Sequence, residues 1–300
     1  MRKFFPLLLV IIVLTSCQNE LREKGTPEYI SEIKEWHKKR IENLKKENGW
    51  LNLVGLLWLN EGENKFGSDQ SNNLVFPEGK AEPFMGSFFL KDSTVTIEIN
   101  KNVKVFLKDG GQIEKMILRH DQQPETTVLS YGSLRWFVIK RGDRYGIRLR
   151  DLEADLVKNF SGIETYPVNS DWKFEAKFEK YDPPKKIAVP NILGTIDEEK
   201  SPGALVFSKD GKEYKVDALD EGDSYFLIFA DETSGIETYG GGRFLYTPKA
   251  DSTGKLLIDF NRAYNPPCVF TKYATCPLPP KQNHLKMQIT AGEKNYGHGH

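Results

Sequence analysis

Residues 134–150, LRWFVIKRGDRYGIRLR, predict the fold of this chain most directly. Apolar and aromatic side chains fill Leu134–Lys140 and Tyr145–Arg150, and Gly142-Asp143 separates the two runs. Short β-type runs around a Gly-Asp turn are typical of a β-hairpin. The segment therefore predicts two antiparallel strands.

Similar runs continue along the chain at Thr94–Ile99, Tyr225–Ala230, Lys255–Phe260 and Leu285–Thr290. They alternate, or are rich in β-branched and aromatic residues, as strands are. Only residues 151–159 have a second, weak helical pattern. We predict a mainly β protein with an N-terminal helix and two sandwich-like or barrel-like modules.

The predicted helix covers residues 26–49. Thr26-Pro27 has the form of an N-cap followed by proline at the first helical position. Apolar residues then recur every three to four positions, and Gly49 stands where a C-terminal cap is expected. We expect the first β module over residues 50–180 and the second over 181–297. The proline-rich stretch Asp182–Pro190 is the predicted seam between them, within a range for the boundary of about 165 to 195.

The N-terminus has the pattern of an export signal. Arg2 and Lys3 precede an apolar run from Phe4 to Leu14, about half of the ~20 residues that a membrane span needs. The ending Leu14-Thr15-Ser16-Cys17 resembles the bacterial lipoprotein box, in which the cysteine carries the lipid. We predict a signal peptide over 1–16, a tether over 17–25 and lipid on Cys17, which anchors the chain to an envelope membrane. An ordinary signal peptide is the alternative.

The charge of the chain is balanced, with 42 basic and 42 acidic residues. Without Arg2 and Lys3, 40 basic residues remain against 42 acidic ones. Nucleic-acid binding requires a basic face. We therefore predict no nucleic-acid partner.

The glycine-rich segment around residue 241 is the first candidate for a ligand site. Gly240, Gly241 and Gly242 permit a close backbone approach to an anion, and Arg243 offers a planar donor fork for carboxylate or phosphate. The alternative is a structural turn that leads into the strand Phe244–Thr247, with Arg243 paired to an acid.

The second candidate is the stretch DFNRAYN, residues 259–265. At a period of two, Asp259 and Asn261 share one face of the strand end, next to Arg262 and Tyr264. A buried carboxylate needs a partner, and Arg243 or Arg262 offers one. We predict that these residues form a small-anion site with aromatic walls, which include Tyr239 and Tyr273, or that they form a structural network.

The two remaining cysteines, Cys268 and Cys276, lie eight residues apart within a proline-rich loop. In an exported protein a disulfide is the first expectation. Free thiols, a metal site with His284 or a nucleophilic cysteine remain open alternatives. We predict no bound metal and no cofactor.

Two blocks of sequence carry a family resemblance. GWLNLVGLLWLNEGENKFGSD, residues 49–69, and ETYGGGRFLYTP…LLIDFNRAYNPPCVFTKYATCPLPP, within residues 237–280, resemble the DUF1684 family of bacterial and archaeal proteins. The resemblance implies no activity, because the function of the family is unknown. Residues 61–99 also resemble the opening of forkhead-associated β-sandwiches, which implies a fold only.

The functional prediction is an envelope lipoprotein with a site for a small anionic ligand in its second β module. If it is an enzyme, we expect hydrolysis, with Asp259 as general base and Arg243 as the clamp for the substrate or oxyanion. The alternative is a structural or protein-interaction lipoprotein without catalytic activity.

Overall fold

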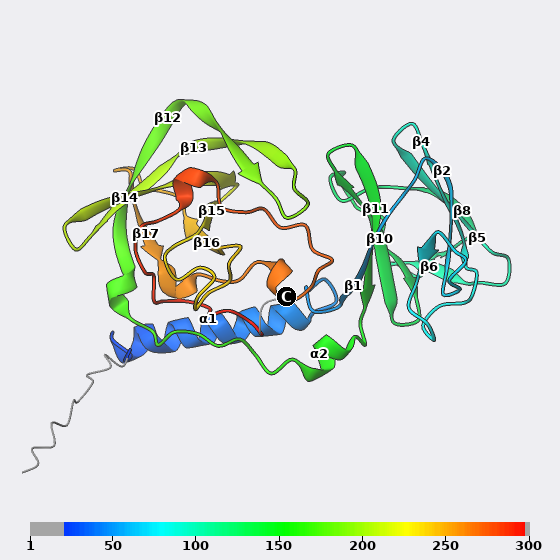
Figure 1. The fold of residues 1–300 in the computed structure, drawn as a ribbon, viewed down its shortest axis with the longest axis horizontal. Coiled ribbons are helices and arrows are strands. Elements are labelled where there is room, and N and C mark those ends of the chain that lie inside the picture. The colour runs from blue at the N-terminus through cyan, green and yellow to red at the C-terminus, as the bar shows by residue number, and fades with distance from the viewer. Residues whose placement is uncertain (1–20, 298–300) are drawn as a thin grey trace, which may run out of the picture.

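The computed structural model describes residues 21–297, which form two β modules beside one long helix, α1 (Pro27–Lys45). Figure 1 has the C-terminal module on the left, the N-terminal module on the right and α1 along the lower side of the C-terminal module. The predicted mainly β fold with an N-terminal helix is confirmed. Within residues 21–297, no helix has the length and apolar character that crossing a membrane requires. The predicted signal peptide and Cys17 lie outside the described residues.

Helix α1 begins as its sequence predicts and ends earlier. The Thr26 side chain accepts the backbone N–H of Tyr29 (3.2 Å), and Pro27 occupies the first turn. The helix ends at Lys45 with Lys46 as its cap, so the prediction that Gly49 caps it was wrong. Gly49 instead lies in the turn that follows, where a Cβ would stand 2.2 Å from the Leu44 carbonyl oxygen.

The N-terminal module is a sandwich of two sheets. Its strands are β1 (Leu53–Trp58), β2 (Gly62–Gly67), β3 (Leu74–Val75), β4 (Gly86–Lys91), β5 (Thr94–Ile99), β6 (Val105–Leu107), β7 (Gln112–Ile113), β8 (Lys115–Leu118), β9 (Leu129–Tyr131), β10 (Leu134–Arg141) and β11 (Arg144–Asp151). One sheet has the order β1-β11-β10-β9-β6-β7, and the other has the order β3-β2-β4-β5-β8. The predicted hairpin is the pair β10–β11, whose register joins Arg141 to Arg144 across Gly142-Asp143.

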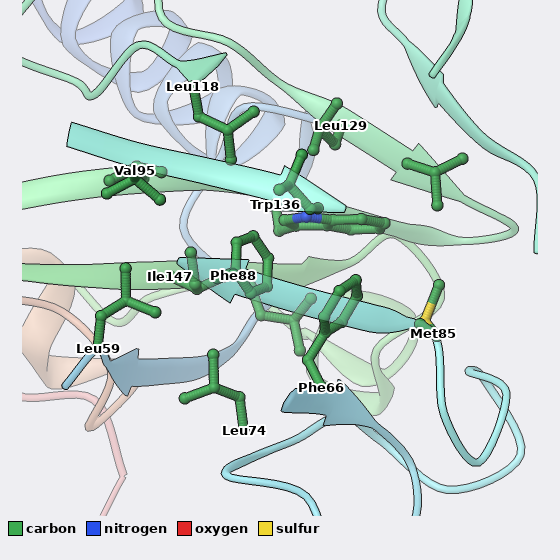
Figure 2. Packing of buried hydrophobic residues seen from close by; sticks show 14 of the residues in the cluster. Leu59, Phe66, Leu74, Met85, Phe88, Val95, Leu118, Leu129, Trp136 and Ile147 are labelled. Atoms are coloured by element: carbon green, nitrogen blue, oxygen red, sulfur yellow. The ribbon is translucent and has the colours of Figure 1, made fainter. Parts of the chain in front are cut away.

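Apolar side chains from both sheets meet in the core between them (Figure 2). Trp136 of β10 is fully buried there, and its ring lies 5.5 Å from that of Phe76 and 6.2 Å from that of Phe66. Along β11, Ile147 and Leu149 point into this core. Because side chains of a strand alternate between faces, Arg148 points to the opposite side, toward the C-terminal module.

The C-terminal module is one strongly curved antiparallel sheet. Its strands are β12 (Lys173–Pro190), β13 (Ile196–Lys209), β14 (Lys212–Glu221), β15 (Ser224–Phe229), β16 (Arg243–Pro248) and β17 (Lys255–Asp259), in the order β16-β15-β14-β13-β12-β17. The two outer strands approach each other, and the Thr247 hydroxyl donates to the Leu257 carbonyl oxygen (2.6 Å). The sheet is therefore an almost closed barrel, and its core includes Phe229, Ile258 and Phe260.

The segment Asp182–Pro190, the predicted seam, lies inside β12 rather than between the modules. The register of β12 against β13 shifts between Lys180 and Lys185, where the prolines fall. Proline has no N–H to donate, and an irregularity of this kind in the ladder accommodates it. The connection between the modules is instead the stretch from the short helix α2 (Asp155–Asn159) to the 3-10 turn η1 (Ser170–Trp172).

After β17 the chain runs through loops and the 3-10 turns η2 (Phe260–Arg262), η3 (Pro267–Val269) and η4 (Lys281–Asn283). The predicted strand Leu285–Thr290 is absent from these described residues. Leu285, Met287 and Ile289 alternate and are buried as a strand would have them. The Ile289 carbonyl oxygen, however, accepts a hydrogen bond from Arg243 and not from a neighbouring strand. The alternation therefore reflects packing of this segment against the barrel and not strand pairing.

Candidate functional site

Arg243, the predicted clamp, is fully enclosed in the barrel core. Its Nη2 donates to Asp231 Oδ2 (2.6 Å) and to the Ile289 carbonyl oxygen (3.0 Å), and its Nη1 donates to the Ala291 carbonyl oxygen. The arginine thereby fixes the C-terminal loop against β16. It presents no surface to a ligand, which does not support the predicted role of a clamp.

The glycine segment before Arg243 is a tight turn. Gly242 has φ +80°, and a Cβ there would stand 2.4 Å from Pro279 Cγ and 2.5 Å from the Phe229 carbonyl oxygen. Its N–H donates to the Tyr239 carbonyl oxygen (3.0 Å). Glycine is needed here for backbone conformation and close packing. The turn of Gly240, Gly241 and Gly242 thus follows the structural alternative.

Asp259 and Asn261 come together as predicted, but against helix α1. Asp259 accepts the Tyr29 hydroxyl at both carboxylate oxygens (2.9 Å each) and the Asn261 Nδ2 (3.0 Å). Asn261 is buried and also donates to the Asn169 carbonyl oxygen (2.9 Å). The carboxylate oxygens of Asp259 are used in joining the helix to the barrel, which does not fit a general base.

Arg262 and His37 belong to the same contact. Arg262 pairs with Glu32 of α1, and its Nε lies 3.9 Å from Asp259 Oδ2. His37 Nε2 lies 3.0 Å from the Asn261 carbonyl oxygen, and burial lowers the pKa of His37 to about 4. These residues hold α1 in place and do not join Arg243 at one cavity.

A disulfide joins Cys268 to Cys276, with their Cα atoms 6.1 Å apart. The backbone N–H of each cysteine points to the sulfur of the other, at 3.1 Å and 3.3 Å. The bridge closes the loop that carries Thr275. Cys276 is buried in a small apolar cluster at the junction of the modules, which also includes Leu53 of β1 and Phe226 of β15.

A cavity of about 410 Å³ lies at this junction, between α1, the β10–β11 hairpin and the barrel. Figure 1 shows the three elements meeting where β11 faces the C-terminal module. Aromatic side chains and three arginines dominate its lining, together with residues of the disulfide loop: Trp36, Arg40, Trp50, Arg141, Arg148, Phe226, Phe244, Tyr246, Tyr264, Pro267, Ala274, Thr275, Cys276 and Pro277.

The three arginines of this cavity differ in how their charge is compensated. Arg40 Nε lies 3.3 Å from Glu293 Oε1, and Arg141 Nη1 lies 2.7 Å from Asp121 Oδ2. Arg148 has no carboxylate within 4 Å among residues 21–297. It is 4% exposed, and its Nε–H has no hydrogen-bond partner in the described chain.

Burial lowers the pKa of Arg148 to about 10, and the nearby charge of Arg141 acts in the same direction. Both arginines donate to one hydroxyl: Arg141 Nε and Arg148 Nη2 lie 3.0 Å and 3.1 Å from Thr275 Oγ1. A hydroxyl has two acceptor positions and one proton. Since both acceptor positions of Thr275 are filled, its proton is left to donate, and the group presents only donors to an incoming ligand.

Aromatic rings of the C-terminal module form another part of the cavity wall. Tyr246 of β16 is half-exposed, stacks on Phe226 with centroids 4.8 Å apart, and lies nearly parallel to Tyr264 (12°, 6.3 Å). The Arg40 guanidinium covers Tyr264 at 4.5 Å, and burial raises the pKa of that phenol. A mostly apolar wall facing a few converging polar groups is the usual form of a small-molecule site.

Of the predicted site residues, Tyr264 and Cys276 line the cavity. Several other lining residues were not predicted: Arg148, Arg141, Thr275, Trp36 and Trp50. The alternation of residues in the hairpin 134–150 could have indicated Arg148 and Arg150. They alternate with the core residues Ile147 and Leu149, so both arginines share the face turned away from the sandwich core. Among residues 21–297 there is no group of three or more His, Cys, Asp or Glu side chains placed to hold a metal ion.

Comparison with known families gives one match, to the model for DUF1684, described as a protein of unknown function, over residues 158–294. This part of the chain is similar to DUF1684 proteins. The match confirms the family resemblance for the C-terminal module. The other block that carried the resemblance, residues 49–69, lies outside the matched DUF1684 residues.

One similar solved structure is the solution NMR structure of an uncharacterized protein from Haloarcula marismortui. It is 27% identical, covers 46% of this chain and 78% of its own, and has a TM-score of 0.39. No curated protein matches the chain. The cavity combines both parts of the molecule, because Tyr246, Tyr264 and Thr275 lie within the matched residues 158–294 while Arg141 and Arg148 precede them.

Proposed function

We propose that the cavity at the junction of the two modules binds a small anionic ligand. The observation that carries the proposal is Arg148, a nearly enclosed cation without a carboxylate partner in the described chain. Burying an uncompensated charge is unfavourable unless something pairs with it. An anion in the cavity supplies that partner, because Arg148 lines the cavity and the Thr275 hydroxyl beside it has a proton left to donate.

Binding is better supported than hydrolysis. Asp259 and Arg243, the predicted base and clamp, use their polar atoms in contacts that join α1 and the C-terminal loop to the barrel. Neither residue lines the cavity. The arginine face and the aromatic wall favour recognition of an anion with an apolar body, as a receptor or carrier for a small molecule would require.

The direct test is isothermal titration calorimetry with a panel of small anions at pH 7, on the wild type and on Arg148→Met. We expect at least one anion to bind the wild type and to bind the variant at least tenfold more weakly. Arg144→Met is the matched control, because Arg144 lies on the same strand, is exposed and does not line the cavity. Absence of binding by every anion, or equal binding by Arg148→Met, contradicts the proposal.

We also propose that the chain is exported and anchored by lipid on Cys17 to an envelope membrane. The support is the sequence alone, in which a short apolar run ends at Leu14-Thr15-Ser16-Cys17. Mass spectrometry of the membrane fraction is expected to find a mature N-terminus at modified Cys17, and Cys17→Ser should release the protein. A soluble form that begins at an unmodified residue overturns the anchor.

A further inference from the structure

The charges around the proposed ligand site predict the charge of its ligand. Arg40 faces Glu293, and Arg141 faces Asp121, so each of these pairs contributes no net charge to the cavity. Glu293 is fully enclosed, and burial raises its pKa, but Arg40 and the backbone N–H of Asn265 (2.7 Å) both donate to it. Donors of this kind favour the carboxylate form. With Glu293 as a carboxylate, Arg148 is the arginine of this cavity that has no carboxylate within 4 Å in the described chain.

A single positive charge is matched by a single negative charge. A phosphate monoester carries roughly −1.5 to −2 charges at pH 7, and would leave part of its charge unpaired in an enclosed site. A carboxylate carries one. Its two oxygens also fit the planar donor fork of an arginine, and the free Nε–H of Arg148 belongs to that fork.

The aromatic part of the cavity wall indicates the shape of the ligand body. Phe226, Tyr246 and Tyr264 form a ladder of rings with interplanar angles of 27° and 12°. Phe244 closes one side by an edge contact with Phe226 (5.0 Å, 76°). Flat rings offset against one another are a favourable arrangement for aromatic groups. The volume of about 410 Å³ is near the lower end of the range for small-molecule sites.

We propose that the ligand is a small aromatic monocarboxylate, whose carboxylate pairs with Arg148 and Thr275 and whose ring packs along Phe226, Tyr246 and Tyr264. This inference rests on the proposed anion site and narrows its ligand to one chemical class. Two features are separable by experiment, the single charge and the flat ring.

The charge is tested by calorimetry at pH 7 with 3-phenylpropionate, 3-phenylpropionamide and phenyl phosphate. We expect 3-phenylpropionate to bind at least tenfold more tightly than either of the others, and to lose at least tenfold in Arg148→Met but not in Arg144→Met. Tighter binding of phenyl phosphate, lost in Arg148→Met, overturns the monocarboxylate and leaves the anion site standing. If neither anion binds, or binding survives in Arg148→Met, the anion site itself fails.

The ring is tested with 3-cyclohexylpropionate, which has the same carboxylate and chain length without a flat ring. We expect it to bind roughly 3- to 10-fold more weakly than 3-phenylpropionate, the range for a favourable aromatic pair. Tyr246→Leu, a change at a half-exposed side chain, should remove most of this preference while keeping the carboxylate requirement. Equal or tighter binding of the cyclohexyl acid to the wild type overturns the aromatic class.

Discussion

Arg243 and Arg148 are two nearly enclosed arginines with opposite surroundings. Arg243 lies in the barrel, pairs with the equally buried Asp231 and donates to carbonyl oxygens of the C-terminal loop. Arg148 lies between the modules, donates to Thr275 and has no carboxylate within 4 Å in the described chain. The Nε–H of both arginines is buried without a partner there, so the difference between them is the carboxylate. The first arginine is compensated inside the protein, and the second is not.

The difference separates structural from functional use of the same side chain. Burial lowers the pKa of Arg148 to about 10, and a shift of this size corresponds to roughly 3 kcal/mol of unfavourable burial. No carboxylate of the described residues lies within 4 Å of Arg148, and the more distant charge of Asp121 acts against the effect of burial without cancelling it. A buried charge normally has a partner, and exceptions to this rule are expected at functional sites.

Replacing Arg243 should strongly destabilise the barrel. Arg243→Met leaves Asp231 as a buried, unpaired charge and removes the donors to Ile289 and Ala291. We expect the free energy of unfolding to fall by about 3–5 kcal/mol. Denaturant unfolding measures it, with Arg262→Met, a half-exposed arginine paired with Glu32, as a control that should change by at most ~1 kcal/mol. A loss equally small in both variants would contradict the structural role.

Loss of the disulfide should affect both regions. The bridge between Cys268 and Cys276 closes a loop of about nine residues, and in the chain-entropy model the double Cys→Ser variant loses roughly 2–3 kcal/mol of stability. Thr275 lies in this loop and links Arg141 to Arg148. We therefore expect weaker binding of 3-phenylpropionate as well, measured at a temperature where the variant is folded. If the double Cys→Ser variant binds 3-phenylpropionate as tightly as the wild type does, the disulfide loop does not contribute to the ligand site.

His37 should make the barrel–helix contact sensitive to acid. Burial lowers its pKa from 6.5 to about 4, so between these values the unfolded chain binds more protons than the folded one. Stability is full above pH 6.5 and decreases as pH falls toward 4. Because the ring is partly exposed, we expect about 1–2 kcal/mol of loss from pH 7 to pH 5. In His37→Gln this loss should be absent; an identical pH profile argues against the assignment.

The sequence predicts the fold better than the site, for physical reasons. The hairpin 134–150 and the alternation in 94–99, 225–230 and 255–260 are local patterns, and strands follow from them. Asp259, Asn261 and Arg243 are recognisable as polar residues that need partners. Which partner each one finds, Tyr29 for Asp259 and Asp231 for Arg243, depends on contacts distant in sequence. The cavity is lined by α1, Trp50, the β10–β11 hairpin, β15, β16 and the disulfide loop, so no single stretch contains its pattern.

Replacing Arg148 should change stability least, and in the opposite direction to Arg243. Arg148→Met removes the uncompensated charge and keeps a long apolar side chain between Trp50 and the disulfide loop. Exchanging buried charge for apolar volume is often neutral or stabilising. We expect the free energy of unfolding without ligand to stay equal or rise by about 1 kcal/mol, while anion binding is lost.

Denaturant unfolding of Arg148→Met with and without 3-phenylpropionate tests both parts of this expectation. The wild type should be stabilised by the ligand, because the ligand binds only the folded state, and the variant should not respond. Arg148→Gln, which keeps a polar group in the same place, should also lose the response. A fall in stability of 2 kcal/mol or more in Arg148→Met would indicate that this arginine holds the modules together as Arg243 holds the barrel, and the contrast between the two would disappear.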